Sequence, residues 1–437
     1  MVEERGELPA VHEAWLPREH ALHRPRHGGR QLTALLSALV FFATPTMLWV
    51  LGGRPAEIEN HALAGFPGIT EGWGLFTGLP EWATDQLVFR AAAIQAADDV
   101  SRSIFGEPAP LDQGGAPPAG PLPGNTPPPR GEPDGPVPGP PTGNQRGQRR
   151  VIEGNDGWLY YGLDAEAKCS PMRPITQTVD KLNELRRAVQ NSGRQFIFVV
   201  PPDKTTMVPQ HLPEEYPNKE CSQEVAADFW RLITGRGRAV DLRPGLAEAA
   251  ERIGQPAYPP QDTHWRDEGS IVLARQLAEQ VQPGITQRWT TRPVGKYTSN
   301  ADLPVILGRQ DKKSSMRYEL RPDGRADRTG PYIEDIDTPV RRYATPVPGA
   351  VDKPTLIFGD SFTNASSSYL PAAFNDLTLL AYPPMGEHLD AVVQSFVNAE
   401  VIVVESVERS VAGGWLPYLD KAFIERVRTA MAARPVR

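Results

Sequence analysis

The chain has 437 residues, of which 40% are hydrophobic and 23% charged, and its formal net charge is −7. This composition excludes a fibrous protein, a wholly disordered chain and a polytopic membrane protein. The acidic balance, without a clustered basic patch, also argues against a nucleic-acid-binding protein.

Residues 31–51 form the first landmark, because they read QLTALLSALVFFATPTMLWVL without a single charge. Such a run is long enough to cross a bilayer as one helix. Arginines precede it and acidic residues follow, which predicts a cytoplasmic tail over 1–30 and an extracellular remainder. A cleaved signal peptide is the alternative, but Pro45 and Trp49 favour a spanning helix. We therefore expect a single-pass protein of the cell membrane.

Two segments separate this helix from the rest of the chain. Residues 52–106 predict a membrane-proximal arm that is helical from about 81 to 105. Residues 107–148 contain fourteen of the 46 prolines and nine of the 39 glycines, which predicts a disordered, extended linker. A ligand for a proline-binding module or a cell-wall spacer is the alternative for this linker.

Residues 149–437 alternate between short apolar runs and amphipathic segments, which indicates an α/β fold. We expect strands at 195–200, 355–358 and 401–404, and helices at 179–192 and 266–282. Continuous apolar runs are typical of a parallel sheet that is covered on both faces.

The chain has two cysteines, Cys169 and Cys221. An even count in an extracytoplasmic domain predicts a disulfide, and two free buried thiols are the alternative.

A Gly-Asp-Ser triplet at 359–361 follows one of the expected strands. Open α/β sheets place their sites at the carboxyl ends of strands. Ser361 is then the candidate nucleophile, with Gly359 allowing close backbone approach and the turn amides, that of Ser361 included, supporting an oxyanion. Ordinary turn residues are the alternative interpretation.

A second motif, Asp262-Thr-His264-Trp, strengthens this hypothesis. In an extended segment residues i and i+2 project to the same side, so Asp262 can orient the His264 imidazole toward a serine. The alternative makes Asp262 a helix N-cap and His264 a surface residue. Outside the first 27 residues the competing histidines are His61, His211 and His388. We expect no metal, because no histidine pair or Cys/His cluster has ligand spacing.

With these motifs in order, the chain resembles the alginate O-acetylation family of AlgJ and AlgX, whose catalytic domain is SGNH-hydrolase-like. The matching segments are Glu59-Asn60, Ala64–Pro67, Asp85, Phe89-Arg90, EGNDGWLYY at 153–161, VVPPDKTTMVPQHLP at 199–213, DTHW at 262–265, GDSF at 359–362 and VESVERS beginning at 404. The chain departs from the family at the Pro-rich insertion and at 298–303, which lacks the expected Gly-Asp-Leu.

The resemblance implies a three-layer αβα, flavodoxin-like domain over 149–437 that acts as an O-acetyltransferase on an exopolysaccharide or cell-wall glycan. It implies Ser361 as nucleophile through an acetyl-serine intermediate, His264 as base and Asp262 as its orienting carboxylate. No cofactor is expected, and a membrane-bound O-acyltransferase is the implied partner that supplies acetyl groups. The alternatives are a carbohydrate acetylesterase with the same triad and a non-catalytic polysaccharide-assembly protein.

Three further expectations concern matched residues outside the triad. The aromatic residues of Gly157–Tyr160 are expected in the core. Lys204 is expected either to face the cleft or to lie solvated in a loop. Glu408 and Arg409 are expected to form an ion pair.

Overall fold

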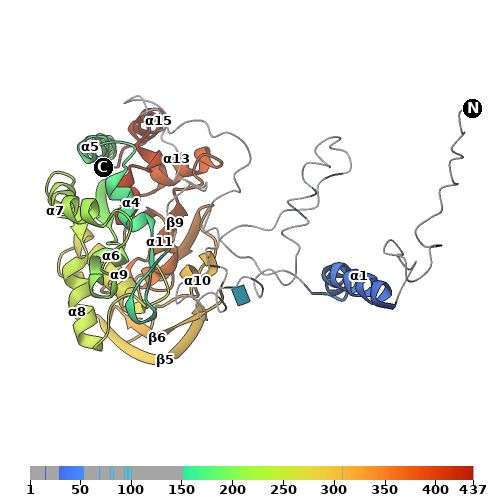
Figure 1. The fold of residues 1–437 in the computed structure, drawn as a ribbon. Coiled ribbons are helices and arrows are strands. Elements are labelled where there is room, and N and C mark those ends of the chain that lie inside the picture. Colours follow the sequence, from blue (N-terminus) through green and yellow to red (C-terminus); the bar gives the residue numbers. More distant parts are fainter. Residues whose placement is uncertain are drawn as a thin grey trace, which may run out of the picture. The chain divides into compact units, whose positions relative to one another are not determined.

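The structure is a computed structural model that describes residues 29–53, 151–307 and 309–436, together with the single residues 15, 68, 79, 82, 93, 96, 97 and 100 (Figure 1). The chain divides into two compact units, residues 1–109 and 110–437. The expected linker over 107–148 lies outside the described residues, and so does nearly all of the cytoplasmic tail and of the membrane-proximal arm.

In the first unit, the helix α1 spans Gly29–Val50 and ends at a turn in which Gly52 has a φ of +94°. The expectation that this run is helical is confirmed. Among the residues that the structure describes, however, no helix is both long enough and apolar enough to cross a membrane. The predicted transmembrane span over 31–51 is therefore not confirmed.

The second unit is built on a six-stranded sheet with the order β4-β3-β10-β8-β9-β7. Its strands are β3 (Gln195–Val200), β4 (Ala239–Asp241), β7 (Val340–Tyr343), β8 (Thr355–Gly359), β9 (Asp376–Ala381) and β10 (Val401–Glu405). All neighbouring pairs are parallel except β7 with β9, which is antiparallel. The three strands expected from the sequence are confirmed.

The expectation of a purely parallel sheet is wrong, because the edge strand β7 makes the sheet mixed. β7 reads Val-Arg-Arg-Tyr, and three of its four side chains are exposed. Strands of a covered parallel sheet are recognised by continuous apolar runs. β7 is an edge strand without such a run, so this pattern does not mark it.

Helices cover both faces of the sheet, and the alternation of side chains along each strand divides the core in two. Along β3, Ile197 and Val199 belong to one cluster, whereas Phe196 and Phe198 belong to the other. The first cluster includes apolar residues of α8 (Arg243–Ile253), α9 (Asp267–Val281), α11 (Ser361–Ala365) and α12 (Leu370–Ala373). The second includes those of α5 (Ile175–Gln190), α7 (Lys219–Gly235), α13 (Leu389–Asn398), α14 (Glu408–Gly413) and α15 (Lys421–Ala432). This is the expected three-layer αβα arrangement, and α5 and α9 confirm the two expected helices.

Two hairpins stand outside the main sheet. β1 (Val151–Glu153) pairs with β2 (Leu159–Tyr161), and the longer β5 (Thr290–Asn300) pairs with β6 (Lys312–Arg321). The short helix α10 (Asp302–Ile306) lies in the connection between β5 and β6. Figure 1 shows β5 and β6 as a long curved ribbon at one side of the unit.

Local contacts confirm two other expectations. Cys169 ends α4 (Leu163–Cys169), and it forms a disulfide with Cys221 in the first turn of α7. Trp158 and Tyr160 are 7% and 0% exposed, so the aromatic residues of this segment do fill the core.

Candidate active site

The turn that follows β8 positions Ser361 at the carboxyl end of a strand in the middle of the sheet. Asp360 caps α11, because its Oδ1 accepts a hydrogen bond of 3.0 Å from the backbone amide of Phe362. Ser361 is the first residue of α11 and its side chain is exposed. The predicted strand–turn–helix context of the serine is confirmed.

Glu405, at the end of the neighbouring strand β10, holds this turn in place by hydrogen bonds. Its buried Oε2 accepts hydrogen bonds from the amides of Asp360 (3.0 Å) and Thr363 (3.1 Å) and from the Thr363 hydroxyl (2.7 Å). Burial raises the pKa of the Glu405 carboxyl well above its ordinary value. A Cβ at position 359 would collide with the Thr363 hydroxyl and the Glu405 carboxylate, so the close approach requires Gly359.

His264 reaches Ser361 from the loop that precedes α9. Its Nε2 lies 2.9 Å from the Ser361 Oγ, and its Nδ1 lies 3.1 Å from the Asp262 Oδ1. The same Asp262 oxygen accepts the His264 backbone amide at 2.9 Å. α9 begins only at Asp267, with Arg266 as its N-cap, so Asp262 is not the cap of this helix. The structure therefore brings Asp262, His264 and Ser361 into one continuous chain of contacts.

Asp262 is 1% exposed, and its carboxylate has two further polar partners. Its Oδ2 lies 2.7 Å from the Lys313 ammonium and accepts the Asp302 amide at 3.3 Å. Although burial raises the pKa of the Asp262 carboxyl, His264 and Lys313 outweigh this effect and hold it below its ordinary value. Asp262 is thus a carboxylate at neutral pH.

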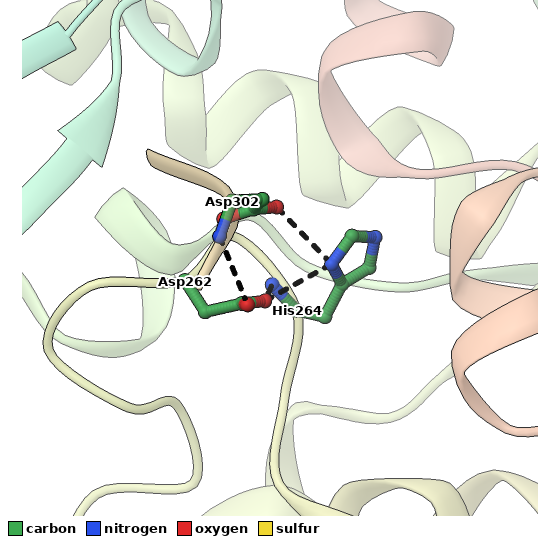
Figure 2. A group of neighbouring side chains, drawn as sticks. All are labelled: Asp262, His264 and Asp302. Carbon is green, nitrogen blue, oxygen red and sulfur yellow. Dashed lines mark hydrogen bonds and ion pairs between the residues drawn. The ribbon is translucent and has the colours of Figure 1, made fainter. Parts of the chain in front are cut away.

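A second carboxylate, Asp302, also contacts the imidazole, with its Oδ2 3.3 Å from Nδ1 (Figure 2). Burial lowers the pKa of His264, but the hydrogen bonds and charges of Asp262 and Asp302 overcome this effect and raise it to about 9. Because two carboxylates face Nδ1, the neutral imidazole keeps its proton there and presents the Nε2 lone pair to Ser361.

Asp262, His264 and Asp302 also form, within the described part of the chain, a group of three possible metal ligands whose atoms lie within 4.8 Å of one another. The Lys313 ammonium already lies beside this group, and a divalent cation there would face its repulsion. We assign no metal to these residues.

Lys204 lies beneath the same loop and is 1% exposed. Its ammonium donates to the backbone carbonyls of Leu159 (2.7 Å), Pro260 (2.6 Å) and Asp262 (3.2 Å). Burial lowers the pKa of Lys204 to about 7, against the opposing effect of nearby carboxylates. Both expected positions, facing the cleft or solvated, are wrong, because carbonyls of β2 and of the loop that carries Asp262 converge on this buried side chain.

A pocket of about 300 Å³ opens over Ser361 and His264. Its walls include Tyr297, Arg317, Tyr332, Asn364 and Tyr369. A second cleft of about 800 Å³ lies on the other side of Lys313 and Ser315, which line both cavities. The site therefore has room for a small acyl group and, beside it, for a larger ligand.

Comparison with known proteins identifies the family of the chain. Residues 151–373, just over half of the chain, match the family model of the SGNH hydrolase-like domain, acetyltransferase AlgX. The chain belongs to this family. The expected resemblance to AlgJ and AlgX is thereby confirmed.

Individual relatives of this AlgX-family chain are distant. The probable alginate O-acetylase AlgJ of Pseudomonas syringae pv. tomato is 25% identical over 167 residues, which cover 37% of this chain and 42% of the relative. The corresponding protein of Azotobacter vinelandii is 25% identical over 138 residues, or 31% and 35% of the two chains. The chain spans less than half the length of these curated relatives.

The chain is also similar to solved structures. The O-acetyltransferase domain of Pseudomonas putida AlgJ has a TM-score of 0.43 at 20% identity, covering 64% of this chain and 98% of that one. Pseudomonas aeruginosa AlgX has a TM-score of 0.41 at 13% identity, covering 62% and 66%.

The expected ion pair between Glu408 and Arg409 is wrong in this AlgX-family domain, because each residue binds partners on other elements. Glu408 lies 3.0 Å from Lys168, and Arg409 lies 3.1 Å from Asp203. The side chains of Glu408 and Arg409 point to different partners at the start of α14. Lys168 neutralises the charge of Glu408, and Asp203 neutralises that of Arg409. This cluster holds the loop that leads into α6 (Lys204–Met207) and thus into Lys204.

Sequence reasoning missed Asp302 and Lys313 as members of the site. Asp302 follows β5 and Lys313 lies in β6, about forty and about fifty residues beyond the Asp-Thr-His-Trp motif. The available signal was the stretch 298–303, where the resemblance led us to expect Gly-Asp-Leu and the chain has Ala301-Asp302-Leu303.

Proposed function

We propose that the chain is an O-acetyltransferase that modifies an exopolysaccharide or cell-wall glycan through an acetyl-serine intermediate on Ser361. The observation that carries this proposal is the contact of the Ser361 hydroxyl with an imidazole whose far nitrogen binds a buried carboxylate. Membership of a family described as acetyltransferase supports it, as do the names of its relatives, probable alginate O-acetylases.

In the first half-reaction, Ser361 Oγ attacks the acetyl carbonyl of the donor while His264 Nε2 takes the hydroxyl proton. The tetrahedral intermediate collapses, the bond to the leaving oxygen breaks, and His264 returns the proton to that oxygen. Asp262 keeps the imidazole oriented and stabilises the imidazolium. We assign the Ser361 amide to the developing oxyanion, and Gly359 keeps the turn close enough to present it.

In the second half-reaction, a sugar hydroxyl attacks the acetyl-serine carbonyl and gives its proton to His264. The bond between the acetyl carbon and Ser361 Oγ then breaks, and Ser361 recovers the proton. Water in place of the sugar gives an esterase instead. The cleft of about 800 Å³ beside the catalytic pocket favours a bound carbohydrate acceptor over water alone.

The compartment and the partner are further proposals. The disulfide between Cys169 and Cys221 supports an extracytoplasmic domain, since disulfides persist in oxidising compartments. An outward-facing domain has no direct access to cytoplasmic acetyl donors, which supports a membrane-bound O-acyltransferase as the supplier. Attachment through residues 31–51, with the N-terminus in the cytoplasm, stays a prediction from the sequence.

The purified chain is expected to release acetate from a chromogenic acetyl ester, and S361A should lower this rate at least about 10³-fold. With oligosaccharides present, mass spectrometry should detect acetylated sugar. Acetate without any acetylated sugar would favour the esterase. An S361A variant as active as the wild type would contradict the assignment of the nucleophile.

A further inference from the structure

The connection between β5 and β6, together with the start of β6, brings two opposite charges to Asp262 and His264. Asp302 is the first residue of α10, and Lys313 is the second residue of β6. Lys313 contacts Asp262, whereas Asp302 contacts the His264 imidazole itself. Figure 2 shows Asp262 and Asp302 approaching Nδ1 of the same ring from two segments of the chain.

The Asp302 carboxylate is held in place rather than free to swing toward solvent. Its Oδ1 accepts the Thr263 amide at 2.8 Å, and its Oδ2 accepts the Thr263 hydroxyl. The Asp302 amide in turn donates to Asp262, and the Leu303 amide donates to the Gln261 carbonyl at 3.3 Å. The start of α10 is therefore bound to the loop of Asp262 and His264 at several points.

Charge counting shows what this arrangement does to the imidazole. Asp262 and Asp302 bring two negative charges, and Lys313 brings one positive charge. With a neutral imidazole, one negative charge is left uncompensated, whereas an imidazolium neutralises the group. When His264 takes the proton of Ser361, the imidazolium that forms is thus stabilised by two carboxylates, whereas a triad has only one.

We propose that Asp302 is a positioning residue for the reaction, a second carboxylate that shares the Nδ1 proton of His264 with Asp262 and stabilises the imidazolium. This inference rests on the proposed function, because it presumes that His264 is the base for Ser361. It adds to that function a residue that acts only through the imidazole.

The consequence is a base that stays protonated to high pH. Since the pKa of His264 is raised to about 9, the neutral form that can accept a proton is depleted as the pH falls below that value. The rate should therefore rise with pH up to about 9. The charged and titratable groups around the ring and its pocket are Asp262, Asp267, Asp302, Lys313, Arg317, Tyr297, Tyr332 and Tyr369, with Lys204 bound to the Asp262 carbonyl.

NMR titration of the His264 ring in the ¹⁵N-labelled full chain tests this inference, with a His264 variant to assign the signals. D302N should lower the pKa of His264 by about one unit or more, and Lys313→Met should raise it. Asp311→Asn, the same substitution at an exposed position on the same connection, should leave it unchanged. If D302N fails to fold, D302S takes its place, because its hydroxyl can still accept from Thr263.

The pH dependence of acetate release should follow the titration of His264. In D302N, the rise of the rate with pH should therefore occur at a lower pH than in the wild type. Asp302→Glu should restore the wild-type midpoint in part, because it restores the charge. A purely structural Asp302 would lower the rate at every pH and leave the midpoint in place, which would overturn the inference. If the wild type and S361A are equally active, the proposed function fails, but the titration still decides whether Asp302 acts on His264.

Discussion

At the scale of single residues, Lys204 links the buried interior to the site. Its three backbone acceptors belong to β2 and to the loop that carries Asp262, and its ammonium lies 5.1 and 5.2 Å from the ring centres of Trp158 and Tyr160. All three ammonium hydrogens therefore have a carbonyl partner. The side chain determines where the backbone of Asp262 lies, although it never contacts Ser361 in the described geometry.

Lys204→Met should remove a donor from the carbonyls of Leu159, Pro260 and Asp262, of which the Pro260 oxygen keeps the Leu159 amide at 2.9 Å. Because an unsatisfied buried polar group costs about 1–3 kcal/mol, we expect the free energy of unfolding in urea to fall by about 3 kcal/mol. The rate of acetate release should fall with it, since Asp262 would lose its support. Lys353→Met, at an exposed lysine before β8, is the matched control. Equal stability of the two variants would show that the carbonyl contacts of Lys204 contribute nothing.

At the scale of elements, the turn between β8 and α11 depends on close contact with the end of β10. Gly359→Ala should push the Thr363 hydroxyl and the Glu405 carboxyl group away from residue 359. Overpacking of this kind costs about 1–3 kcal/mol. We expect a lower midpoint of thermal unfolding and a loss of acetate release that exceeds the loss of folded protein.

Gly386→Ala is the control for this substitution, because a Cβ there meets no atom within 4 Å. It should keep both the midpoint and the rate. A Gly359→Ala variant that retains full activity would mean that the turn tolerates displacement of Glu405 and that the close contact at Gly359 is not required for catalysis.

The elements that sequence could predict are those whose own residues carry the signal. β3, β8 and β10 are buried on both faces and read as apolar runs, and α5 and α9 show helical spacing of their buried residues. Asp262, His264 and Ser361 were predictable because each lies in a short motif with a local geometric reason.

The remaining elements have no such signal. β5 is mostly exposed, and β6 alternates exposed, half-buried and buried residues with only Leu320 and Tyr318 packing in the core, so no clear apolar pattern marks this pair among the described residues. β7 takes its direction from its pairing with β9, which is a tertiary contact. Asp302, Lys313 and Lys204 contribute through contacts with distant segments, which the local sequence around them does not encode.

At the scale of the whole molecule, the disulfide joins α4 to α7 across a sequence separation of 52 residues. Closing such a loop restricts the unfolded chain and corresponds to about 4 kcal/mol in the chain-entropy treatment. The closed segment contains α5, β3 and α6, and hence Lys204. An oxidising compartment would thus stabilise the part of the domain that supports the loop of Asp262 and His264, in agreement with the proposed extracytoplasmic location.

If Ser361 carries the acetyl group between donor and acceptor, rapid-quench mass spectrometry will find that group on its side chain. The full chain is mixed with a chromogenic acetyl ester, quenched in acid during turnover, digested and mapped. We expect one acetyl group on Ser361, which is absent from S361A and strongly reduced in His264→Ala. Turnover without acetylation of Ser361, or with the acetyl group on another residue, would contradict this expectation.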